Sequence, residues 1–465
     1  MAKMPFFFTL FAAFAAMPQL IAADDDTVWE QRATQARINI LKAYHPNPEQ
    51  VTREFNERVS MEWNETMGEL QVADGMRSTT TTIASSIYNN SYNNGTKRRE
   101  LRKRGKWRGG RCLATNPMDR CWRCDRNWAA NRKRLADCAM GFAKGTTGGK
   151  AGSYYVVTDP SDNDVVEPKP GTLRHAVIQK RPLWITFARS MTIKLARELI
   201  MQSDKTIDGR GVSVHIAGGA GITVQFVRNV IIHNVKIGDI VPTPGGWLRD
   251  SADHKGIRTG DEGDGITIFA SHHVWIDHVS MYNCADGIID AVAGSTAVTI
   301  SNSHFTDHDK VLLFGANNWD PVDKVMQITV AFNHFGKRLH QRMPRCRWGL
   351  FHIVNNDYTH WVMYAVGGSA GATIVSQGNR YIAQPGVNPF KEVTHRDCPD
   401  ASWKSWTWVS SGDVFMNGAF FTQSGDLQGA QKYGHRDLVT ALSGSTVGLI
   451  TRFAGHLYCS PSTPC

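Results

Sequence analysis

Short apolar runs recur through the middle of the chain, and their spacing is the strongest structural signal in the sequence. Aligned on the last apolar residue of each run, the intervals are 44, 24, 30, 23 and 23 residues, between anchors at Ile237, Met281, Phe305, Phe335, Tyr358 and Tyr381. An interval of 44 residues is close to two turns of about 22, and 30 is one turn with a longer loop. Such irregular periods are typical of a solenoid whose loops vary in length on one face.

Asparagines occupy a fixed place in this repeat. Asn333, Asn356 and Asn379 each lie two residues before an anchor. At the corners of stacked coils, asparagines in register can hydrogen-bond along the stack and satisfy their buried amides, although three unrelated turn asparagines would give the same spacing. No long helical pattern follows each strand, which argues against a TIM barrel or a doubly wound sheet. The pattern predicts an all-β fold, a right-handed single-stranded parallel β-helix, over residues 112–425.

The regions on either side of this repeat have a different character. Residues 24–74 carry helical periodicity that is interrupted at Pro46 and Pro48, which predicts a short helical N-terminal segment of two helices. The repeat signal fades after Phe421, and residues 426–465 are expected to form a C-terminal tail. Two cysteines near the end of the chain could pin this tail, Cys459 and Cys465.

Residues 75–111 are predicted to be a linker followed by a basic run. The first part is rich in Ser, Thr and Asn. In the second part, residues 97–111, nine of fifteen residues are Lys or Arg. Such a run is either a solvated or disordered segment or an arm that binds polyanions.

Residues 1–23 have the features of a secretory signal peptide. Lys3 precedes an apolar run over 6–16, and small residues at 22–23 precede three aspartates. A membrane anchor is the alternative, but the run is too short to span a bilayer, and no later segment reaches about 18 apolar residues. We therefore expect a secreted, extracellular protein that has no membrane anchor and no nucleic acid partner.

Charge and cysteine content are compatible with that location. The formal net charge of +10 favours a polyanionic partner: nucleic acid, an anionic membrane surface or an acidic polysaccharide. Nine cysteines, an odd number, leave at least one thiol outside an intramolecular pair. Four cysteines cluster between residues 112 and 138, where Cys121-Trp-Arg-Cys124 could be a zinc or redox motif, but a secreted chain favours disulfides. Sequons for N-glycosylation begin at Asn64, Asn89 and Asn94.

Carboxylates crowd the first third of one stretch, Asp261 to Arg347. Glu262 and Asp264 would share a face about 7 Å apart on a strand. Asp286 and Asp290 would lie about 13 Å apart on an extended strand, too far for one ion unless the chain bends at the glycine between them. A flexible carboxylate cluster suits Ca²⁺, and no converging His and Cys set indicates zinc. Solvated turn carboxylates are the alternative interpretation.

Basic residues crowd the last third of the same stretch. Lys310, Arg342 and Arg347 lie on coils that follow the acidic ones, so a parallel stack brings the two sets to neighbouring rungs. Arginine is suited to a bidentate grip on a carboxylate. The stretch therefore predicts a cation site that handles an acidic substrate. A surface guanidinium, or a clamp on a backbone carbonyl, is the alternative role for Arg342.

Several blocks of this stretch resemble the plant pectate lyases of the parallel β-helix polysaccharide lyase family, over about residues 121–421. The blocks are Asp-Glu-Gly-Asp-Gly at 261–265, Trp-Ile-Asp-His at 275–278, Cys-Ala-Asp-Gly-Ile-Ile-Asp at 284–290 and Gln-Arg-Met-Pro-Arg-Cys-Arg at 341–347. The resemblance implies that Ca²⁺ is bound by Asp264, Asp286 and Asp290. Relatives usually carry Ser or Asp where Glu262 stands, so this fourth ligand rests on position alone. The resemblance also implies a Cys121–Cys138 disulfide.

The same resemblance implies the chemistry. Arg342 would abstract the C5 proton of galacturonate, and Lys310 and Arg347 would bind the substrate. The expected activity is that of a Ca²⁺-dependent pectate lyase, a monomer that cleaves (1→4)-α-D-galacturonan, the demethylated pectin of the plant cell wall, by β-elimination. Because a guanidinium is normally protonated, its use as a base implies an alkaline pH optimum.

Two other functions remain open at this point. One is a pectin lyase that acts on methylated pectin without Ca²⁺, which the acidic cluster disfavours, and the other is a non-catalytic protein that binds polygalacturonate in the wall. A hydrolase would need a pair of carboxylates that handle water, which the arginines do not supply. The chain also departs from the family pattern at Trp348, at Gly371-Ala372 and at Asn317-Asn318-Trp319, which predicts a different rim for the cleft.

Overall fold

The computed structural model describes residues 23–73, 112–386, 389–425 and 441–465. The expected signal peptide, except for its last residue, and the expected linker with its basic run lie outside the described residues. Within the described residues, no helix is both long enough and apolar enough to cross a membrane.

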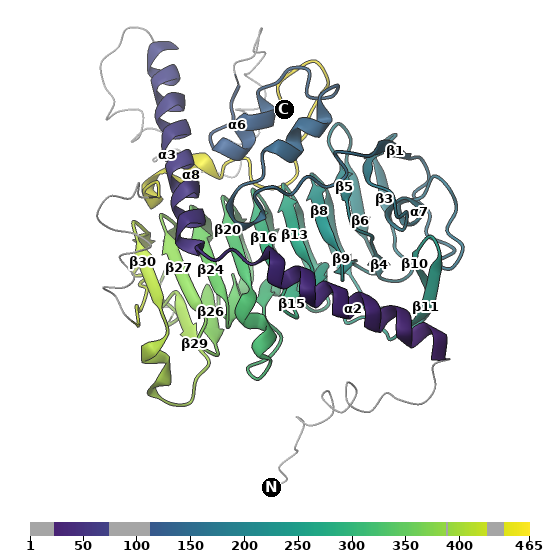
Figure 1. Ribbon diagram of the computed structural model, residues 1–465. Helices are drawn as coiled ribbons and strands as arrows, with labels where there is room; N and C mark the ends of the chain where they lie inside the picture. Colours follow the sequence, from purple (N-terminus) through teal and green to yellow (C-terminus); the bar gives the residue numbers. More distant parts are fainter. Residues whose placement is uncertain (1–22, 74–111, 387–388, 426–440) are drawn as a thin grey trace.

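The chain forms three long parallel sheets and contributes a strand to each of them in turn (Figure 1). Sheet A has ten strands: β1 (Ser153–Val157), β2 (Leu183–Phe187), β5 (Lys205–Asp208), β8 (Arg228–His233), β13 (His272–Asp277), β16 (Thr296–Ser301), β20 (Gln327–Ala331), β24 (Leu350–Val354), β27 (Thr373–Gln377) and β30 (Trp408–Ser411). Sheet B has nine: β3 (Met191–Ile193), β6 (Val214–Ala217), β9 (Lys236–Ile240), β14 (Ser280–Cys284), β17 (His304–Thr306), β21 (His334–Phe335), β25 (Asp357–Thr359), β28 (Arg380–Ile382) and β31 (Val414–Met416).

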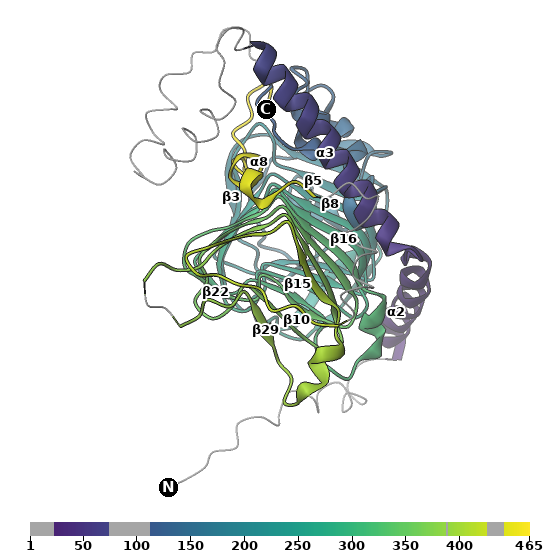
Figure 2. The same ribbon diagram turned by 90° about the vertical axis from the view of Figure 1, so that its left-hand side faces the viewer.

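Sheet C has eight strands: β4 (Leu199–Ile200), β7 (Ile222–Gln225), β12 (Ile266–Phe269), β15 (Ile289–Val292), β19 (Leu312–Phe314), β23 (Arg345–Arg347), β26 (Val366–Ser369) and β29 (Thr394–Arg396). Two small sheets are added, an antiparallel pair, β10 (Gly246–Ser251) with β11 (His254–Arg258), and a parallel pair, β18 (His308–Lys310) with β22 (Leu339–Gln341). Seen nearly end-on in Figure 2, the coils lie one behind another. The fold is the predicted parallel β-helix.

The apolar anchors found in the sequence lie in register in sheet B. Ile237 pairs with Met281, and each following anchor pairs with the next, through Phe305, Phe335, Tyr358 and Tyr381 to Phe415. The rings of Phe335 and Tyr358 are stacked with centroids 4.5 Å apart, and so are those of Tyr358 and Tyr381. Because the anchors are buried among the other core residues, the irregular intervals in the sequence reflect loops that are excluded from the core.

The asparagine ladder is also present. The Asn333 side-chain amide donates to Asn356 Oδ1 at 3.0 Å, and the Asn356 amide donates to Asn379 Oδ1 at 3.0 Å. The same two oxygens accept from the backbone N–H groups of Asn333 and Asn356. Asp413 ends the ladder, because its Oδ1 accepts from the Asn379 amide. All three asparagines are buried, so the stack satisfies polar groups that water cannot reach.

The N-terminal segment forms two helices, both longer than predicted: α2 (Ala23–Ala43) and α3 (Pro48–Ala73). They lie along one side of the β-helix (Figures 1 and 2). Phe55 of α3 stacks on Phe332, with centroids 5.5 Å apart, and meets His352 edge-on. Asn56 donates to Gln377 Oε1 at 2.9 Å in a buried contact. Helix α3 therefore covers the outer face of sheet A with apolar and polar contacts together.

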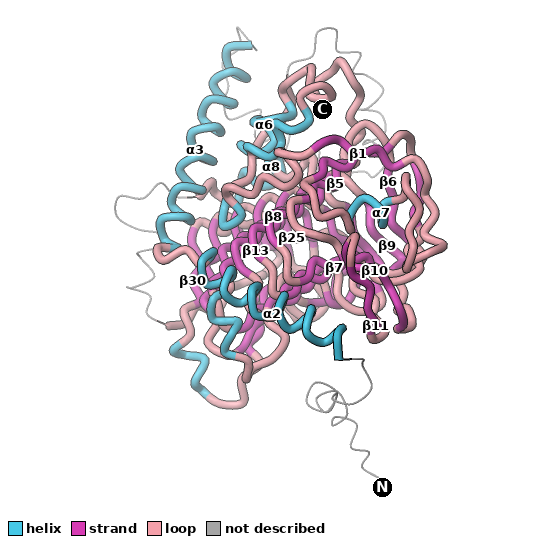
Figure 3. The backbone as a smooth tube through the Cα atoms, turned by 45° about the vertical axis from the view of Figure 1, so that its right-hand side comes forward, coloured by secondary structure: helices cyan, strands magenta, loops and turns pink. Residues whose placement is uncertain are grey.

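Further helices among the described residues are short, as Figure 3 shows by colour. They are α6 (Pro117–Arg123), η1 (Arg132–Asp137), η2 (Gly141–Ala143), α7 (Leu173–Val177), η3 (Pro321–Val325), η4 (Ala401–Ser405), η6 (Gly444–Thr446) and α8 (Val447–Ile450). Disulfides join Cys121 to Cys138, as the family resemblance implied, and Cys112 to Cys124. The cluster is thus a pair of disulfides rather than a zinc or redox motif.

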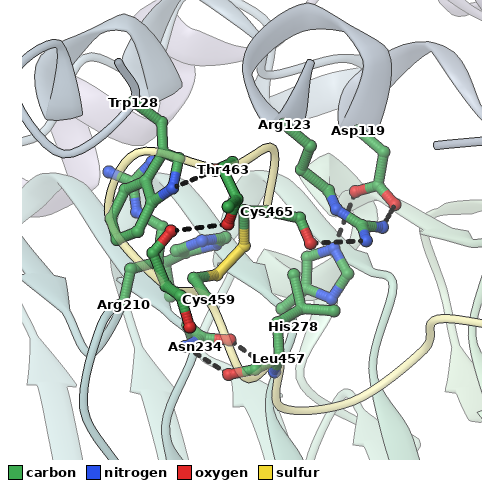
Figure 4. Close-up of a disulfide and its surroundings, with 12 residues drawn as sticks. Asp119, Arg123, Trp128, Arg210, Asn234, His278, Leu457, Cys459, Thr463 and Cys465 are labelled. Carbon is green, nitrogen blue, oxygen red and sulfur yellow. Dashed lines mark hydrogen bonds and ion pairs between the residues drawn. A yellow bond between two sulfur atoms is a disulfide. The ribbon is translucent and has the colours of Figure 1, made fainter. Parts of the chain in front are cut away.

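The end of the chain is held against the segment that carries α6 (Figure 4). Cys459 is bonded to Cys465, and the Cys465 carbonyl accepts from Arg123. Arg123 also forms a buried ion pair with Asp119 at 2.5 Å, and the other Asp119 oxygen contacts His278 Nε2 at 2.7 Å. Cys284, Cys346 and Cys398 are the three thiols outside disulfides.

Replacing Asn356 with Ala is expected to destabilise the fold. The substitution leaves the buried backbone N–H of Asn333 without its acceptor and opens a gap in the ladder, at a cost of about 2–4 kcal/mol. Guanidinium unfolding followed by tryptophan fluorescence gives the free energy of unfolding, with Asn127→Ala as the control because Asn127 is exposed. Equal losses in the two variants would mean that the ladder adds nothing to stability.

His352 is expected to make the protein sensitive to acid. Burial lowers its pKa from 6.5 to about 4. The folded state then binds its proton less readily than the unfolded state, so stability present above pH 6.5 is lost as the pH falls toward 4. The loss is about 2–3 kcal/mol for this group. Urea unfolding at pH 7 and pH 4.5 measures how much the free energy of unfolding falls between the two. The fall should be smaller by this amount in His352→Gln than in the unchanged protein. An identical pH dependence would contradict the assignment.

Candidate active site

The stacking of four successive coils places four of the predicted site residues beside one another, each before or near the start of a strand of sheet C. Asp264 precedes β12, Asp286 precedes β15, Lys310 ends β18 and Arg342 precedes β23. Backbone hydrogen bonds connect these turns directly: Gly265 N–H donates to Gly287 O, Ile288 N–H to Lys310 O and Leu312 N–H to Arg342 O. Stacking therefore follows the order acid, acid, base, base along the axis of the β-helix.

Asp264 and Asp290 face the same small space above Gly287. The Gly287 N–H donates to Asp264 Oδ1 at 2.7 Å, and Thr267 Oγ1 donates to Asp264 Oδ2 at 2.9 Å. A Cβ atom added to Gly287 would lie 3.0 Å from Asp264 Oδ1 and 2.7 Å from the Asp290 Cγ. Glycine is thus needed here for space, and the chain bends around it at residues 285–286 and 288. Residues 261–265 lie outside any strand, so the predicted strand spacing of Glu262 and Asp264 is wrong.

Electrostatic repulsion and burial act together on these carboxylates. Burial raises the pKa of Asp264 to about 6, and the charges of Asp286 and Glu262 add to this rise. Burial, followed by the charges of Asp264 and Asp286, raises the pKa of Asp290 well above its ordinary value. The Oδ1 atom of Asp290 is buried and makes no hydrogen bond. This orphaned oxygen beside a second carboxylate is a place where a cation would be stabilised.

Asp286 and Glu262 are arranged differently from the predicted four-carboxylate site. The Lys310 ammonium donates to Asp286 Oδ1 at 2.5 Å. Glu262 is exposed, and its charge acts on Asp264. Across the described parts of the chain, no three Asp, Glu, His or Cys side chains are placed so that they could hold one metal ion. The structure therefore brings Asp264 and Asp290 together, with Asp286 paired to the lysine of the next coil.

Arg342 is held in a constrained backbone conformation beside this cluster. Its φ is +63°, in the left-handed region that a residue other than glycine seldom occupies. The flanking backbone is fixed on both sides, since the Arg342 carbonyl accepts from Leu312 N–H and the Met343 N–H donates to Ala365 O. Its Nε atom is buried and has no hydrogen-bond partner. A strained, partly orphaned guanidinium beside carboxylates is typical of a functional site.

Arg347 lies at the far end of β23 and is anchored by the loop that follows β19. Its guanidinium donates to Gly315 O at 2.6 Å and to Asn318 Oδ1 at 3.2 Å. Burial, with the neighbouring charges of Arg345 and Arg342, lowers the pKa of Arg347 to about 10. Three arginines on one rung thus form a basic strip next to the acidic coils.

Known proteins share both the sequence and the fold. Residues 130–401 match the model of a family described as pectate lyase, and residues 21–101 match a family described as pectate lyase, N terminus. A pectate lyase from Lilium longiflorum is 52% identical over 98% of this chain and 98% of its own length. One from Nicotiana tabacum is 60% identical over 77% of this chain and 90% of its own.

The chain belongs to the pectate lyase family.

A solved structure of the same fold is that of jun a 1, the major allergen from cedar pollen. It is 41% identical to this chain, covers 74% of it and 99% of its own length, and superposes with a TM-score of 0.70. The family match over residues 21–101 includes both N-terminal helices, so these helices are part of the pectate lyase sequence pattern.

Some residues around the pectate lyase site were not identified from the sequence. Arg345 forms an ion pair with Asp397, and Tyr364 lies beside Arg342 and Arg345, whose charges oppose the rise that burial causes in the pKa of its hydroxyl. His308 Nε2 contacts the backbone carbonyl of Asp286 at 2.6 Å. The alternation of Arg345 with Arg347 could have indicated Arg345, but nothing in the local sequence marks Tyr364.

Proposed function

We propose that this chain is a Ca²⁺-dependent pectate lyase. It cleaves (1→4)-α-D-galacturonan by β-elimination and leaves 4,5-unsaturated galacturonosyl ends. The observation that carries the proposal is the position of Arg342 one coil beyond Lys310, which is paired with Asp286. Such an arrangement places a guanidinium next to groups that would hold an acidic sugar. It supports the family's chemistry in this particular chain.

The carboxylates fit a hard cation, which the family relationship implies. The orphaned Asp290 oxygen and the repulsion between Asp264 and Asp290 would both be relieved by Ca²⁺, which prefers oxygen ligands. Asp286 would complete the set if it exchanged Lys310 for the ion, and the position of Glu262 leaves it as an outer ligand at most. Held there, Ca²⁺ would neutralise the carboxylate of the reacting sugar and so acidify its C5 proton.

The protein side chains then have separate tasks. The guanidine of Arg342 removes the proton from C5, the electron pair forms the C4–C5 double bond, and the bond from C4 to the glycosidic oxygen breaks. That oxygen takes up a proton from the solvent, and Arg342 returns its own proton to the solvent, so no water is consumed. Lys310, once released from Asp286, and Arg347 bind uronate carboxylates and hold the chain in place.

We also propose that the protein is secreted as a monomer into the plant cell wall after loss of residues 1–23. Of the three predicted glycosylation sites, Asn64 is exposed on α3, and Asn89 and Asn94 lie outside the described residues. A pectin lyase acting on methylated pectin would gain nothing from a carboxylate cluster.

Arg342→Lys is expected to reduce the rate by about 10²–10⁴-fold, because a lysine amine at this position has a different reach and geometry from the guanidine that acts as the base. The assay follows the ultraviolet absorbance of unsaturated uronides released from polygalacturonate, with Arg189→Lys on the exposed surface as the matched control. Full activity in Arg342→Lys would refute the assignment of the base. Binding without any absorbance rise in the unchanged protein would favour a non-catalytic protein.

Asp290→Asn is expected to separate ion binding from folding. In EDTA the variant should melt a few degrees above the unchanged protein, because it removes repulsion from a buried carboxylate. Adding Ca²⁺ should raise the melting temperature of the unchanged protein but not that of Asp290→Asn. A Ca²⁺-dependent rise that survives the substitution would place the ion elsewhere, and undiminished activity on methylated pectin in EDTA would favour a pectin lyase.

A further inference from the structure

The loop between β19 and η3 is fixed to the end of sheet C that lies away from Arg342. Asn318 Oδ1 accepts from Arg347 at 3.2 Å and from Ser369 Oγ at 2.6 Å, so it joins two successive coils. Gly315 O accepts from Arg347 at 2.6 Å. The loop is therefore bound directly to an arginine that the proposed function assigns to the substrate.

The same loop presents a large aromatic side chain to solvent. Trp319 is 67% exposed, although its neighbours are anchored. Its backbone N–H donates to Asn317 Oδ1 at 3.0 Å, and Asp320 accepts from Val322 N–H to begin η3. Below the loop, the buried Asp323 accepts from Gly294 N–H at 2.7 Å. Contacts on both sides of Trp319 thus fix the course of the loop that presents its exposed side chain.

The position of Trp319 relative to the arginines indicates what could meet its ring. Arg342 lies before the turn at residues 343–344, and Arg347 ends the short strand β23. The loop with Trp319 contacts Arg347. A polysaccharide that is bound by Arg347 would therefore pass beside Trp319.

We propose that Trp319 and Asn318 form a distal sugar-binding subsite of the groove. The indole face of Trp319 stacks on the apolar face of a pyranose ring, and Asn318 orients Arg347 toward the carboxylate of that sugar or its neighbour. A planar ring next to a fixed guanidinium suits an acidic sugar, because one supplies apolar contact and the other supplies charge. This inference rests on the proposed function and adds a preference for longer galacturonan chains.

The test measures binding and turnover as a function of chain length. Trp319→Ala is expected to raise KM for polygalacturonate about five- to tenfold with kcat nearly unchanged, and to leave KM for trigalacturonate unaltered. Trp319→Phe should recover most of the loss. Tyr458→Ala is the matched control, because Tyr458 is 68% exposed and lies near Lys236 on sheet B, away from this loop.

A second measurement separates this inference from the proposed function. Calorimetric titration in Ca²⁺ with polygalacturonate and with trigalacturonate is done in an Arg342→Lys background, so that the ligands are not consumed. A length-dependent loss of affinity on adding Trp319→Ala supports the subsite even if the unchanged protein shows no lyase activity. Binding equal to that of the Tyr458→Ala control, or an equal loss for both ligands, would overturn the subsite while leaving the lyase assignment intact.

Discussion

Every coil of this protein must match the side chains of the coils on either side, and the rest of the structure depends on that register. A single coil of a parallel β-helix is not stable alone, because the hydrogen-bond partners of each strand lie about 4.8 Å away in the neighbouring coils. The stacked rings of Phe335, Tyr358 and Tyr381 fix this register inside sheet B, and the asparagine ladder fixes it at the adjoining corner. A shift of one coil by one residue would turn its ring and its asparagine to the opposite face and break both stacks.

The same register creates the charged site. Because loops at one edge of sheet C stack as strictly as the strands do, carboxylates from two coils and basic groups from the next two are brought together. Burial raises the pKa of Asp264 and of Asp290, and repulsion from neighbouring carboxylates raises both further. Lys310 offsets part of that repulsion by pairing with Asp286. The fold thus holds the carboxylates of Asp264 and Asp290 close together, and an added cation or an acidic ligand can change the repulsion between them.

The sequence was sufficient for features that repeat and insufficient for contacts that do not. The anchors and asparagines were predictable because a buried ring or amide must recur once per coil. The pairing of Lys310 with Asp286 was not, since it depends on rotamers, and neither was the irregular path of residues 261–265, which lack any periodic signal. Tyr364 was missed for a related reason: it reaches the arginines from the following coil, at a place where loop lengths vary.

Contacts of the N-terminal helices were also beyond sequence reasoning, yet they act on the coil that carries Arg342. The backbone of His45, between α2 and α3, exchanges two hydrogen bonds with the side chain of Gln327 in β20, a partner 282 residues away. Phe55 then packs on His352 in β24. Strands β20 and β24 begin and end the turn of chain that contains Arg342 and β23. By contacting both ends of that turn on sheet A, the helices steady the coil that carries Arg342 and β23.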